Sequence, residues 1–480
     1  MAEHRTRSRE AATGKPKAGG VRSNAGAVRP KAELRLKGGG GRREPDGVRD
    51  AVYWFEAGRA AALPPLTGAA WCDTVVVGGG MMGLMAARTL EARGLEVVVV
   101  EADRCGGGAS GRSSGFITPD SELEFSDLVD RYGEAEARRL WEFALGGVGA
   151  IADMLREEQI DADQQRQGAA FVALGERSAR TVRREHAARV GAGFGSRLVC
   201  GERMADLLGA EGYSAAVQFG GTFGINAHQA CVGLRDRLEA RGVRIFEQSP
   251  VRNITPRGLE TAGGEVRARH ILVCADRWLP RLGLARPDLY HAQTFLGISQ
   301  PLADADVARL FPAGPLMVWD TGLVYHYFRL TGGNRLLVGG GTLGSTYSGG
   351  EVHRPEAAAR RLERYLGRHV PWLSVKLEMT WPGLIGVTKD FAPALGRAPG
   401  MPSVHFAGGA AGLPWAAALG RYLAHRILNG RDDFDAVLRA NRRYPVPRKV
   451  QALTGKKLAF ALAHGAMKSG LAGRAGKRGH

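Results

Sequence analysis

The sequence has few cysteines and no paired histidines. Five cysteines are scattered over 480 residues, and no two of them have the CxxC spacing of redox and zinc sites. An odd, scattered set argues against a disulfide framework and favours a cytoplasmic location. The histidines show no HxH or HxxxH spacing, so no metal site is expected.

Long apolar segments are also missing. No run approaches the ~18–20 apolar residues that span a bilayer. The basic N-terminus is not followed by the apolar core of a secretory signal. The sequence therefore predicts neither a membrane span nor a signal peptide.

Acidic residues are missing from one end of the chain. The formal net charge is +18, yet residues 441–480 hold ten Lys and Arg and no acid, and residues 1–49 hold 13 Lys and Arg against 5 acids. The segment between these ends is neutral, so the basic charge belongs to two tails.

The N-terminal tail, residues 1–49, is rich in Gly, Arg, Lys and Ala and has no apolar periodicity, which predicts disorder. One interpretation is an electrostatic arm for nucleic acid or an anionic membrane. The other, which we favour, is a solvated tail or an extension upstream of the true start codon.

The strongest motif is a glycine turn between two apolar strands, within residues 72–101. Gly78 allows a tight turn, Gly80 lets backbone N–H groups approach a pyrophosphate, and Gly83 lets the following helix pack on the strand. The helix N-terminus favours phosphate, and Glu101 at the end of the second strand suits an adenosine ribose. The full turn reads Gly78, Gly79, Gly80, Met81, Met82 and Gly83. Together these features predict a Rossmann-like dinucleotide site.

A second small-residue loop follows, at residues 106–115. It contains Ala109, Ser110, Arg112 and Ser113, and such a loop can surround a ribityl chain and a pyrophosphate through N–H groups and a hydroxyl. This favours a flavin over a nicotinamide, although the loop alone would also fit a solvent-exposed turn.

At this point the chain resembles the FAD-dependent amine and amino-acid oxidases of the D-amino-acid oxidase family, most closely the gamma-glutamylputrescine oxidases. The family's xGASGRNxG loop corresponds to residues 108–115, with Ser113 where asparagine is usual. The other matches are YW at 53–54, FEQSPV at 246–251, YFRLTG at 327–332, GGG at 339–341, WPG at 381–383, DFAP at 390–393, GR at 396–397, FAGG at 406–409 and YP at 444–445. The resemblance covers about residues 50 to 447 and is more specific for the cofactor than for the substrate.

The resemblance implies FAD and several contacts to it. Val251 would touch the adenine through its backbone, and the loop with Gly409, Gly412 and Leu413 would place a helix N-terminus near flavin N1 and O2. Leu413 and Pro414 replace the usual Gly-His-Gly, so this loop offers no cysteine or histidine for attachment. We expect FAD to be bound non-covalently.

The fold expected is α/β: a discontinuous Rossmann-like FAD-binding domain with an α+β, antiparallel-sheet substrate domain and two disordered basic tails. The expected segments are the tail 1–49, FAD-binding parts 50–128, 220–281 and 376–440, substrate parts 129–219 and 282–375, and the basic tail 441–480.

Alternation in residues 323–330, a turn at 331–334 and a second run at 335–338 predict a β-hairpin. Period two puts Tyr325, Tyr327 and Arg329 on one face. The resemblance favours this face as the wall of a catalytic site over the flavin, whereas ordinary packing between sheet and helix is the alternative.

One departure from the family concerns the substrate. Amino-acid oxidases of this family carry an arginine for the substrate carboxylate where this chain has Ile385, and an unpaired buried carboxylate is costly. The resemblance therefore implies oxidation of a gamma-glutamylputrescine-like amine, by hydride transfer to flavin N5, to an imine and then an aldehyde. Arg329 or Lys389 would serve a remote carboxylate, and oxygen or another acceptor would take the electrons.

Three alternatives remain. The chain is an amino-acid oxidase of the same family, or a flavoprotein that acts on modified RNA with its basic tails as arms, or a scaffold with a vestigial flavin. We do not expect nucleic acid to be a partner. Residues 450–472 fit either a basic amphipathic helix in peripheral contact with a membrane or, as in the family, an apolar end that packs on the protein.

Overall fold

The computed structural model describes residues 47–56, 61–120, 122–348 and 351–468, in which the strands form two large sheets and a small one. The expected N-terminal tail lies outside the described residues up to residue 46. No described helix is long and apolar enough to cross a membrane.

The first large sheet contains the predicted crossover. Its strand order is β10-β3-β2-β13-β12-β11, and β20 joins it beside β13 and pairs with β19. The central strands are parallel, and β3 and the C-terminal ends of β2 and β13 are apolar, as expected where a sheet is covered on both faces. The bounds are β2 (Gly68–Val77), β3 (Val97–Val100), β10 (Arg244–Phe246), β11 (Asn253–Thr255), β12 (Gly258–Glu260), β13 (Gly264–Val273), β19 (Ala394–Ala398) and β20 (Met401–Gly408).

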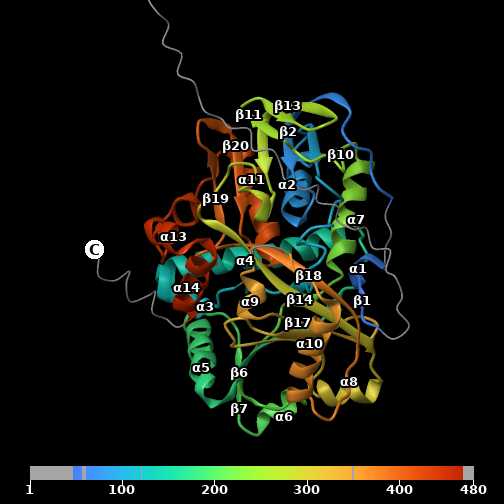
Figure 1. The fold of residues 1–480 in the computed structure, drawn as a ribbon, viewed down its shortest axis with the longest axis vertical. Helices are drawn as coiled ribbons and strands as arrows, with labels where there is room; N and C mark the ends of the chain where they lie inside the picture. Colours follow the sequence, from blue (N-terminus) through green and yellow to red (C-terminus); the bar gives the residue numbers. More distant parts are fainter. Residues whose placement is uncertain (1–46, 57–60, 121, 349–350, 469–480) are drawn as a thin grey trace, which may run out of the picture. The chain divides into compact units, whose positions relative to one another are not determined.

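Helices cover this sheet (Figure 1). Helix α2 follows the glycine turn and packs on α11, which in turn packs on α4. Helix α7 begins at the N-cap Asn226, whose Oδ1 accepts from the N–H groups of His228 and Gln229 at 3.1 Å. The bounds are α2 (Met81–Glu91), α3 (Phe125–Tyr132), α4 (Glu134–Glu157), α7 (Ala227–Ala240), η1 (Asp276–Trp278), α11 (Leu413–Asn429) and α12 (Asp435–Leu438).

The second large sheet is mostly antiparallel, with the order β1-β18-β14-β17-β16-β15-β6-β8-β7. The small sheet has the order β4-β9-β5. The bounds are β1 (Arg49–Asp50), β4 (Phe116–Ile117), β5 (Gln165–Arg166), β6 (Gly168–Leu174), β7 (Arg197–Cys200), β8 (Tyr213–Phe219), β9 (Phe223–Gly224), β14 (Leu289–Pro301), β15 (Leu316–Asp320), β16 (Tyr327–Leu330), β17 (Arg335–Gly340) and β18 (Leu377–Thr388).

Five described helices accompany the second sheet, and α1 follows its edge strand β1. The bounds are α1 (Tyr53–Glu56), α5 (Gly175–Gly191), α6 (Arg203–Leu207), α8 (Asp304–Leu310), α9 (Leu343–Thr346) and α10 (Pro355–His369). Apolar side chains of α10 and of β6, β16 and β17 meet in one core, which includes Leu362, Leu366 and Val338.

The boundary expected at residue 376 is wrong. Strand β18 pairs antiparallel with β14 from Leu289–Thr388 to Ser299–Leu377, so it belongs to the second sheet. Both faces of β18 are covered, so nearly all of its residues are buried and its sequence lacks a polar–apolar alternation. For this reason the sequence did not distinguish β18 from the strands of the first sheet.

The predicted hairpin forms, with a shorter first strand. Strands β16 and β17 pair through Arg329–Leu337 and Leu330–Leu336. Residues 323–326 precede the strand because the Asp320 carboxylate accepts from the N–H groups of Gly322 and His326 and holds this segment as a loop.

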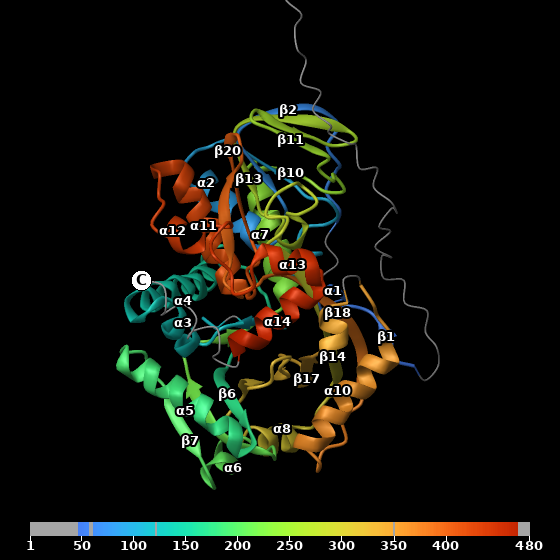
Figure 2. The same cartoon turned by 60° about the vertical axis from the view of Figure 1, so that its left-hand side comes forward.

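The C-terminal tail expected from residue 441 is also corrected. Residues 448–454 and 456–468 form α13 (Arg448–Thr454) and α14 (Lys456–Lys468), which pack on each other (Figure 2). Arg442 is buried, and its Nε and Nη2 donate to Asp390 at 2.8 and 2.7 Å. Part of the C-terminal positive charge is therefore built into the fold.

Candidate active site

The crossover between β2 and α2 has the geometry that its glycines predict. Gly78 has φ +108°, and a Cβ on Gly83 would lie 1.9 Å from the Gly78 carbonyl oxygen. A Cβ on Gly80 would come within 3.1 Å of Ser110 Oγ, which accepts from Met81 N–H at 3.0 Å. The N-cap residue Gly80 has no side chain to cap α2, so the remaining N–H groups of its first turn, including that of Met82, are suited to an anion.

Glu101 lies directly after β3, beside this turn. Its Oε2 accepts from Gly79 N–H at 2.7 Å and its Oε1 from Asp103 N–H at 2.9 Å. Burial raises the pKa of this carboxyl, although the two N–H donors oppose the shift. Each oxygen keeps a further lone pair, so the group can also accept from a ribose hydroxyl.

Two polar residues after β10, Glu247 and Ser249, bind backbone N–H groups of neighbouring segments. Both lie in the FEQSPV match, but the sequence predicted no role for either. Glu247, fully buried after β10, accepts from the N–H groups of Leu63 at 3.0 Å and Cys105 at 2.8 Å. Ser249 Oγ accepts from Leu66 N–H at 2.8 Å. Val251, the predicted adenine contact, follows this pair and is partly buried in the core beside β2 and β13.

Three buried side chains hold three successive carbonyls of the second small-residue loop. Trp381 Nε1 donates to the carbonyl of Arg112 at 3.0 Å, Trp54 Nε1 to that of Ser113 at 2.8 Å, and Arg329 Nε to that of Ser114 at 2.8 Å. These three hydrogen bonds fix the conformation of the loop. Ala109, Arg112 and Ser113 of the loop line a cavity.

Arg329 does not occupy the place that the hairpin face predicted. It is fully buried, and its Nη1 and Nη2 donate to the carbonyls of Leu330 and Ile225 at 2.8 and 2.6 Å. Strand alternation puts Arg329 on the same face as Tyr327, but two residues further along β16, where it no longer lines the cavity. The expectation of a catalytic or carboxylate-binding role is therefore wrong, because its donors are used by the backbone.

Lys389 does not reach the cavity either. It is fully buried, with Nζ 3.4 Å from Asp288 Oδ1 and 3.3 Å from the Val446 carbonyl oxygen. This ammonium pairs with a carboxylate of the protein, so it is not free for a substrate.

The cavity lies between the second sheet and the first turn of α11. Tyr325 and Tyr327 form part of its wall, as predicted, and Ile385 of β18 faces it as well. Burial raises the pKa of both phenols, so each remains a neutral hydroxyl near pH 7.

The turn before α11 completes the wall. Gly412 and Leu413 line the cavity, Gly409 has φ +71°, and Gly412 has φ +100°. Asp276 links this turn to β18, since its carboxylate accepts from Gly409 N–H at 2.9 Å and from Gly386 N–H at 2.7 Å. The acid replaces the family's usual glycine at a positive φ of 41° and fixes the local path.

His464 of α14 lines the same cavity, which the sequence did not predict. Its Nε2 lies 2.8 Å from the Thr388 carbonyl oxygen, which only accepts, so Nε2 carries the proton. Nδ1 then accepts from Tyr347 O–H. Burial lowers the pKa of His464 to about 4, so the ring is neutral near pH 7. The sequence signal that could have found His464 is its position four residues after Phe460, on the same face of a helix.

Glu122 is another residue of the wall that the sequence did not predict. Its Oε1 accepts from Tyr325 O–H at 3.1 Å. Burial raises the pKa of Glu122, while the charge of Lys468 and the Tyr325 hydrogen bond lower it. A lone acid in a loop carries no periodic signal, and only the fold brings it to the cavity.

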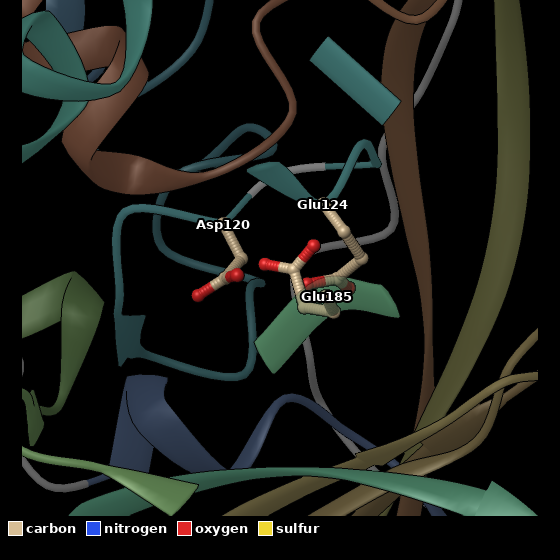
Figure 3. Close-up of side chains that lie close together, drawn as sticks. All are labelled: Asp120, Glu124 and Glu185. Atoms are coloured by element: carbon tan, nitrogen blue, oxygen red, sulfur yellow. The ribbon is translucent and has the colours of Figure 1, made fainter. Parts of the chain in front are cut away.

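Three further carboxylates, Asp120, Glu124 and Glu185, converge beside the cavity (Figure 3). Arg189 lies among them and donates to Asp120 and Glu185. Burial and the charges of Asp120 and Glu185 raise the pKa of Glu124 well above its usual range. The Arg189 guanidinium offsets part of the negative charge of this cluster, which joins Asp120 and Glu124 to α5.

The comparisons agree with this geometry. The family model for FAD-dependent oxidoreductases of the DAO type matches residues 73–426. The chain is 28% identical over 408 residues to gamma-glutamylputrescine oxidoreductase of Escherichia coli (strain K12), which covers 83% of this chain and 93% of that protein. It is 25% identical over 346 residues to glycine oxidase of Geobacillus kaustophilus, which covers 68% of this chain and 84% of that protein.

Solved structures show the same fold. The crystal structure of glycine oxidase from Geobacillus kaustophilus has a TM-score of 0.66 at 21% identity and covers 78% of this chain and 99% of its own. L-proline dehydrogenase from P. horikoshii has a TM-score of 0.63 at 20% identity and covers 77% of this chain and 96% of its own. The uncapped helix end, the tight glycine turn and the Glu101 carboxylate fit FAD. The chain therefore belongs to the DAO family of FAD-dependent oxidoreductases, enzymes that act on amine or amino-acid donors.

Proposed function

We propose that this enzyme oxidises a gamma-glutamylputrescine-like amine rather than a small α-amino acid. The observation that carries the proposal is the charge of the cavity wall. Among its described residues, Arg112 is the one permanent cation, and it belongs to the cofactor loop, whereas Glu122 adds a carboxylate. Ile385 lines the wall at the position where amino-acid oxidases of this family carry a carboxylate-binding arginine, so the α-carboxylate of a small amino acid would be buried there without a partner, at a cost of several kcal/mol.

The proposed cofactor contacts are those of the two glycine-rich loops, the adenine strand and the α11 turn. They are Gly78, Gly80, Met82, Gly83, Glu101, Ala109, Ser110, Arg112, Ser113, Val251, Gly409, Gly412 and Leu413. FAD held by these residues would accept a hydride from the carbon next to the amine nitrogen.

The chain's own residues would orient the amine and exclude water. Ile385, Leu413 and Phe391 give apolar walls, and a dry site strengthens the remaining polar contacts. Tyr327 offers a neutral hydroxyl that can hold a neutral amine nitrogen. Orientation and desolvation then lower the barrier without a strong base.

The residues of the described wall support non-covalent binding of FAD. His464 is the one histidine among the described residues that line the cavity, and both of its ring nitrogens already form hydrogen bonds. Acid precipitation should release yellow colour into the supernatant. Colour retained in the pellet would contradict non-covalent binding.

The test of the function is anaerobic mixing of the yellow protein with a panel of amines, followed by flavin bleaching. Gamma-glutamylputrescine should bleach the flavin quickly, while glycine, D-alanine and D-proline should do so poorly. Ile385→Arg should shift the preference toward α-amino acids, because a guanidinium can pair with their carboxylate. Reoxidation in air would then identify oxygen as an acceptor; slow reoxidation would indicate another one.

The similarity to glycine oxidase favours one second candidate, an amino-acid oxidase. In that case Arg112 would take the substrate carboxylate. Fast bleaching by glycine or D-alanine in the unaltered protein would establish this candidate and displace the amine. A cytoplasmic location remains part of the proposal, since all five cysteines are free thiols.

A further inference from the structure

Glu122 has a place in the cavity that neither the cofactor nor the hydride transfer requires. It lies in the wall two residues beyond Asp120, and only its Oε1 is used, by Tyr325 O–H at 3.1 Å. No described residue donates to Oε2, and no described cation lies within ion-pair distance of this carboxylate.

The neighbouring carboxylates differ from Glu122. Asp120, Glu124 and Glu185 share Arg189, whereas Glu122 has no such partner among the described residues. The nearest described cation that acts on it is Lys468, whose Nζ lies 5.9 Å from the Tyr325 ring centroid. The desolvation of Glu122 is therefore only partly compensated, which is the condition under which an incoming cation gains most.

We propose, building on the amine oxidation above, that Glu122 and Tyr325 form a subsite for a second ammonium group of the substrate, remote from the nitrogen that reacts. The donor class is thus a diamine or an amine with an ammonium at its far end. A gamma-glutamyl amide of a diamine carries such an ammonium on its α-carbon, beside a carboxylate that must lie away from Glu122.

The chemistry excludes the reacting nitrogen as the partner of Glu122. Hydride leaves the carbon readily only when the amine nitrogen is neutral and can supply its lone pair. A carboxylate in contact with an amine stabilises the protonated form and raises the pKa of the amine. Glu122 would therefore oppose the reaction at that nitrogen, but it would help to bind an ammonium elsewhere in the molecule.

The size of the effect follows from the contact. A charge-assisted hydrogen bond is worth about 1.5–3 kcal/mol, or roughly a 10- to 150-fold change in affinity. An isosteric amide at position 122 keeps the Tyr325 hydrogen bond and removes only the charge.

The experiment compares butane-1,4-diamine with butylamine, which have equal chain lengths and differ by one ammonium group. Stopped-flow bleaching under anaerobic conditions gives an apparent dissociation constant and a limiting rate for each amine. Glu122→Gln should weaken binding of the diamine about 10- to 100-fold relative to butylamine. Glu176→Gln, on the exposed face of α5, is the matched control and should leave the ratio between the two amines unchanged.

The outcomes separate the two proposals. An unchanged ratio in Glu122→Gln would overturn the subsite while amine oxidation still stood. An equal fall in the limiting rate for both amines would make Glu122 a group that acts on the reacting nitrogen, which also overturns the subsite. If the unaltered protein is bleached by neither amine nor by gamma-glutamylputrescine, the proposed function fails.

Discussion

Arg329 is a fully buried arginine whose partners are backbone carbonyls rather than a carboxylate. Burial lowers the pKa of its guanidinium to about 10, which still leaves it charged at neutral pH. Two glycines make room for it, because a Cβ on Gly115 would lie 2.8 Å from Nη2 and one on Gly224 would lie 2.5 Å from Nη1. The conformation of the cofactor loop therefore depends on the buried guanidinium of Arg329, which binds the Ser114 carbonyl.

Arg329→Ala should destabilise the fold by about 2–4 kcal/mol, because three buried carbonyls lose their donor. FAD content should fall with it, since the loop at Ser114 loses its support. Thermal unfolding and the ratio of flavin to protein absorbance measure both effects.

The same variant tests the corrected role. The ratio of the Michaelis constants for carboxylate-bearing and plain amines should stay unchanged, because Arg329 does not line the cavity. A selective rise for the carboxylate-bearing amines would restore its substrate role. Arg180→Ala on the exposed face of α5 provides the control for loss of a surface arginine.

These positions also mark the limit of sequence reasoning. Gly78, Gly83 and Glu101 were predictable because the crossover is local, with all its parts within residues 72–101. Arg329 was misjudged because alternation gives the face of a strand but not the distance along it to a cavity. Glu122 and His464 were missed because non-local packing alone brings them to the site.

Helix α11 is held by close contacts on two sides. A Cβ on Gly147 of α4 would lie 2.0 Å from the Pro414 carbonyl oxygen, in the first turn of α11. A Cβ on Gly420 of α11 would lie 2.1 Å from the Met82 carbonyl oxygen of α2. Glycines thus set the spacing of three helices, two of which begin at the proposed cofactor site.

Adjacent glycines of α4 give a matched test. Gly147→Ala should destabilise the protein by about 1–3 kcal/mol, because the methyl group meets backbone that cannot turn away. Gly146→Ala should instead be neutral or stabilise by about 0.5–1 kcal/mol, since that position is open and alanine favours a helix. Chemical denaturation of both variants, with FAD content as a second readout, measures the contrast. Equal effects would mean that the α4–α11 contact is looser than the structure has it.

Helix α14 contributes His464 to the wall of the cavity. The ring connects Tyr347 after α9 to the end of β18, and it stacks on Phe391 with a ring-centroid distance of 3.7 Å. The sequence predicted an amphipathic helix here but not which face it would bury, because an apolar stripe is equally suited to protein and to lipid.

His464→Ala should cost about 1–3 kcal/mol, since it leaves the Tyr347 hydroxyl and the Thr388 carbonyl without partners. Leu462→Ala, at a half-exposed position of the same helix, should change stability by less than about 0.5 kcal/mol. Denaturation curves of the two variants provide the comparison. A larger effect at Leu462 would contradict the packing of α14.

The molecule as a whole joins its two sheets through chain segments that cross between them more than once. Strand β18 belongs to the second sheet, and β19 and β20, which follow it, belong to the first. Asp276 bonds to Gly386 of β18 and to Gly409 after β20, and Asp390 pairs with Arg442. Because these buried polar contacts span both sheets, protonation in one region should affect the unfolding of the whole.

Four buried or partly buried histidines in different parts of the fold should make its stability sensitive to acid. Burial lowers the pKa of His228, His326, His405 and His464 to about 4, whereas the ordinary value is 6.5. Between these values the unfolded chain binds protons that the folded chain does not. Their contribution is therefore fully present above pH 6.5 and is lost as the pH falls toward 4. Buried carboxyls with raised pKa, such as Glu124 and Asp320, change stability in the opposite direction with pH, so a single histidine must be isolated.

His405 of β20 allows that isolation, because no described residue bonds to its Nδ1 and its ring is buried. His405→Phe removes one group that takes up a proton on unfolding and keeps an aromatic ring near His270. From pH 6.5 to 5 the variant should lose about 1–2 kcal/mol less stability than the unaltered protein, given the 1.36 kcal/mol that one pKa unit represents. Above pH 7 the two stability curves should run parallel. Denaturant unfolding of the FAD-saturated proteins across this range measures the difference, and equal acid sensitivity would show that His405 is already protonated in the fold near pH 5.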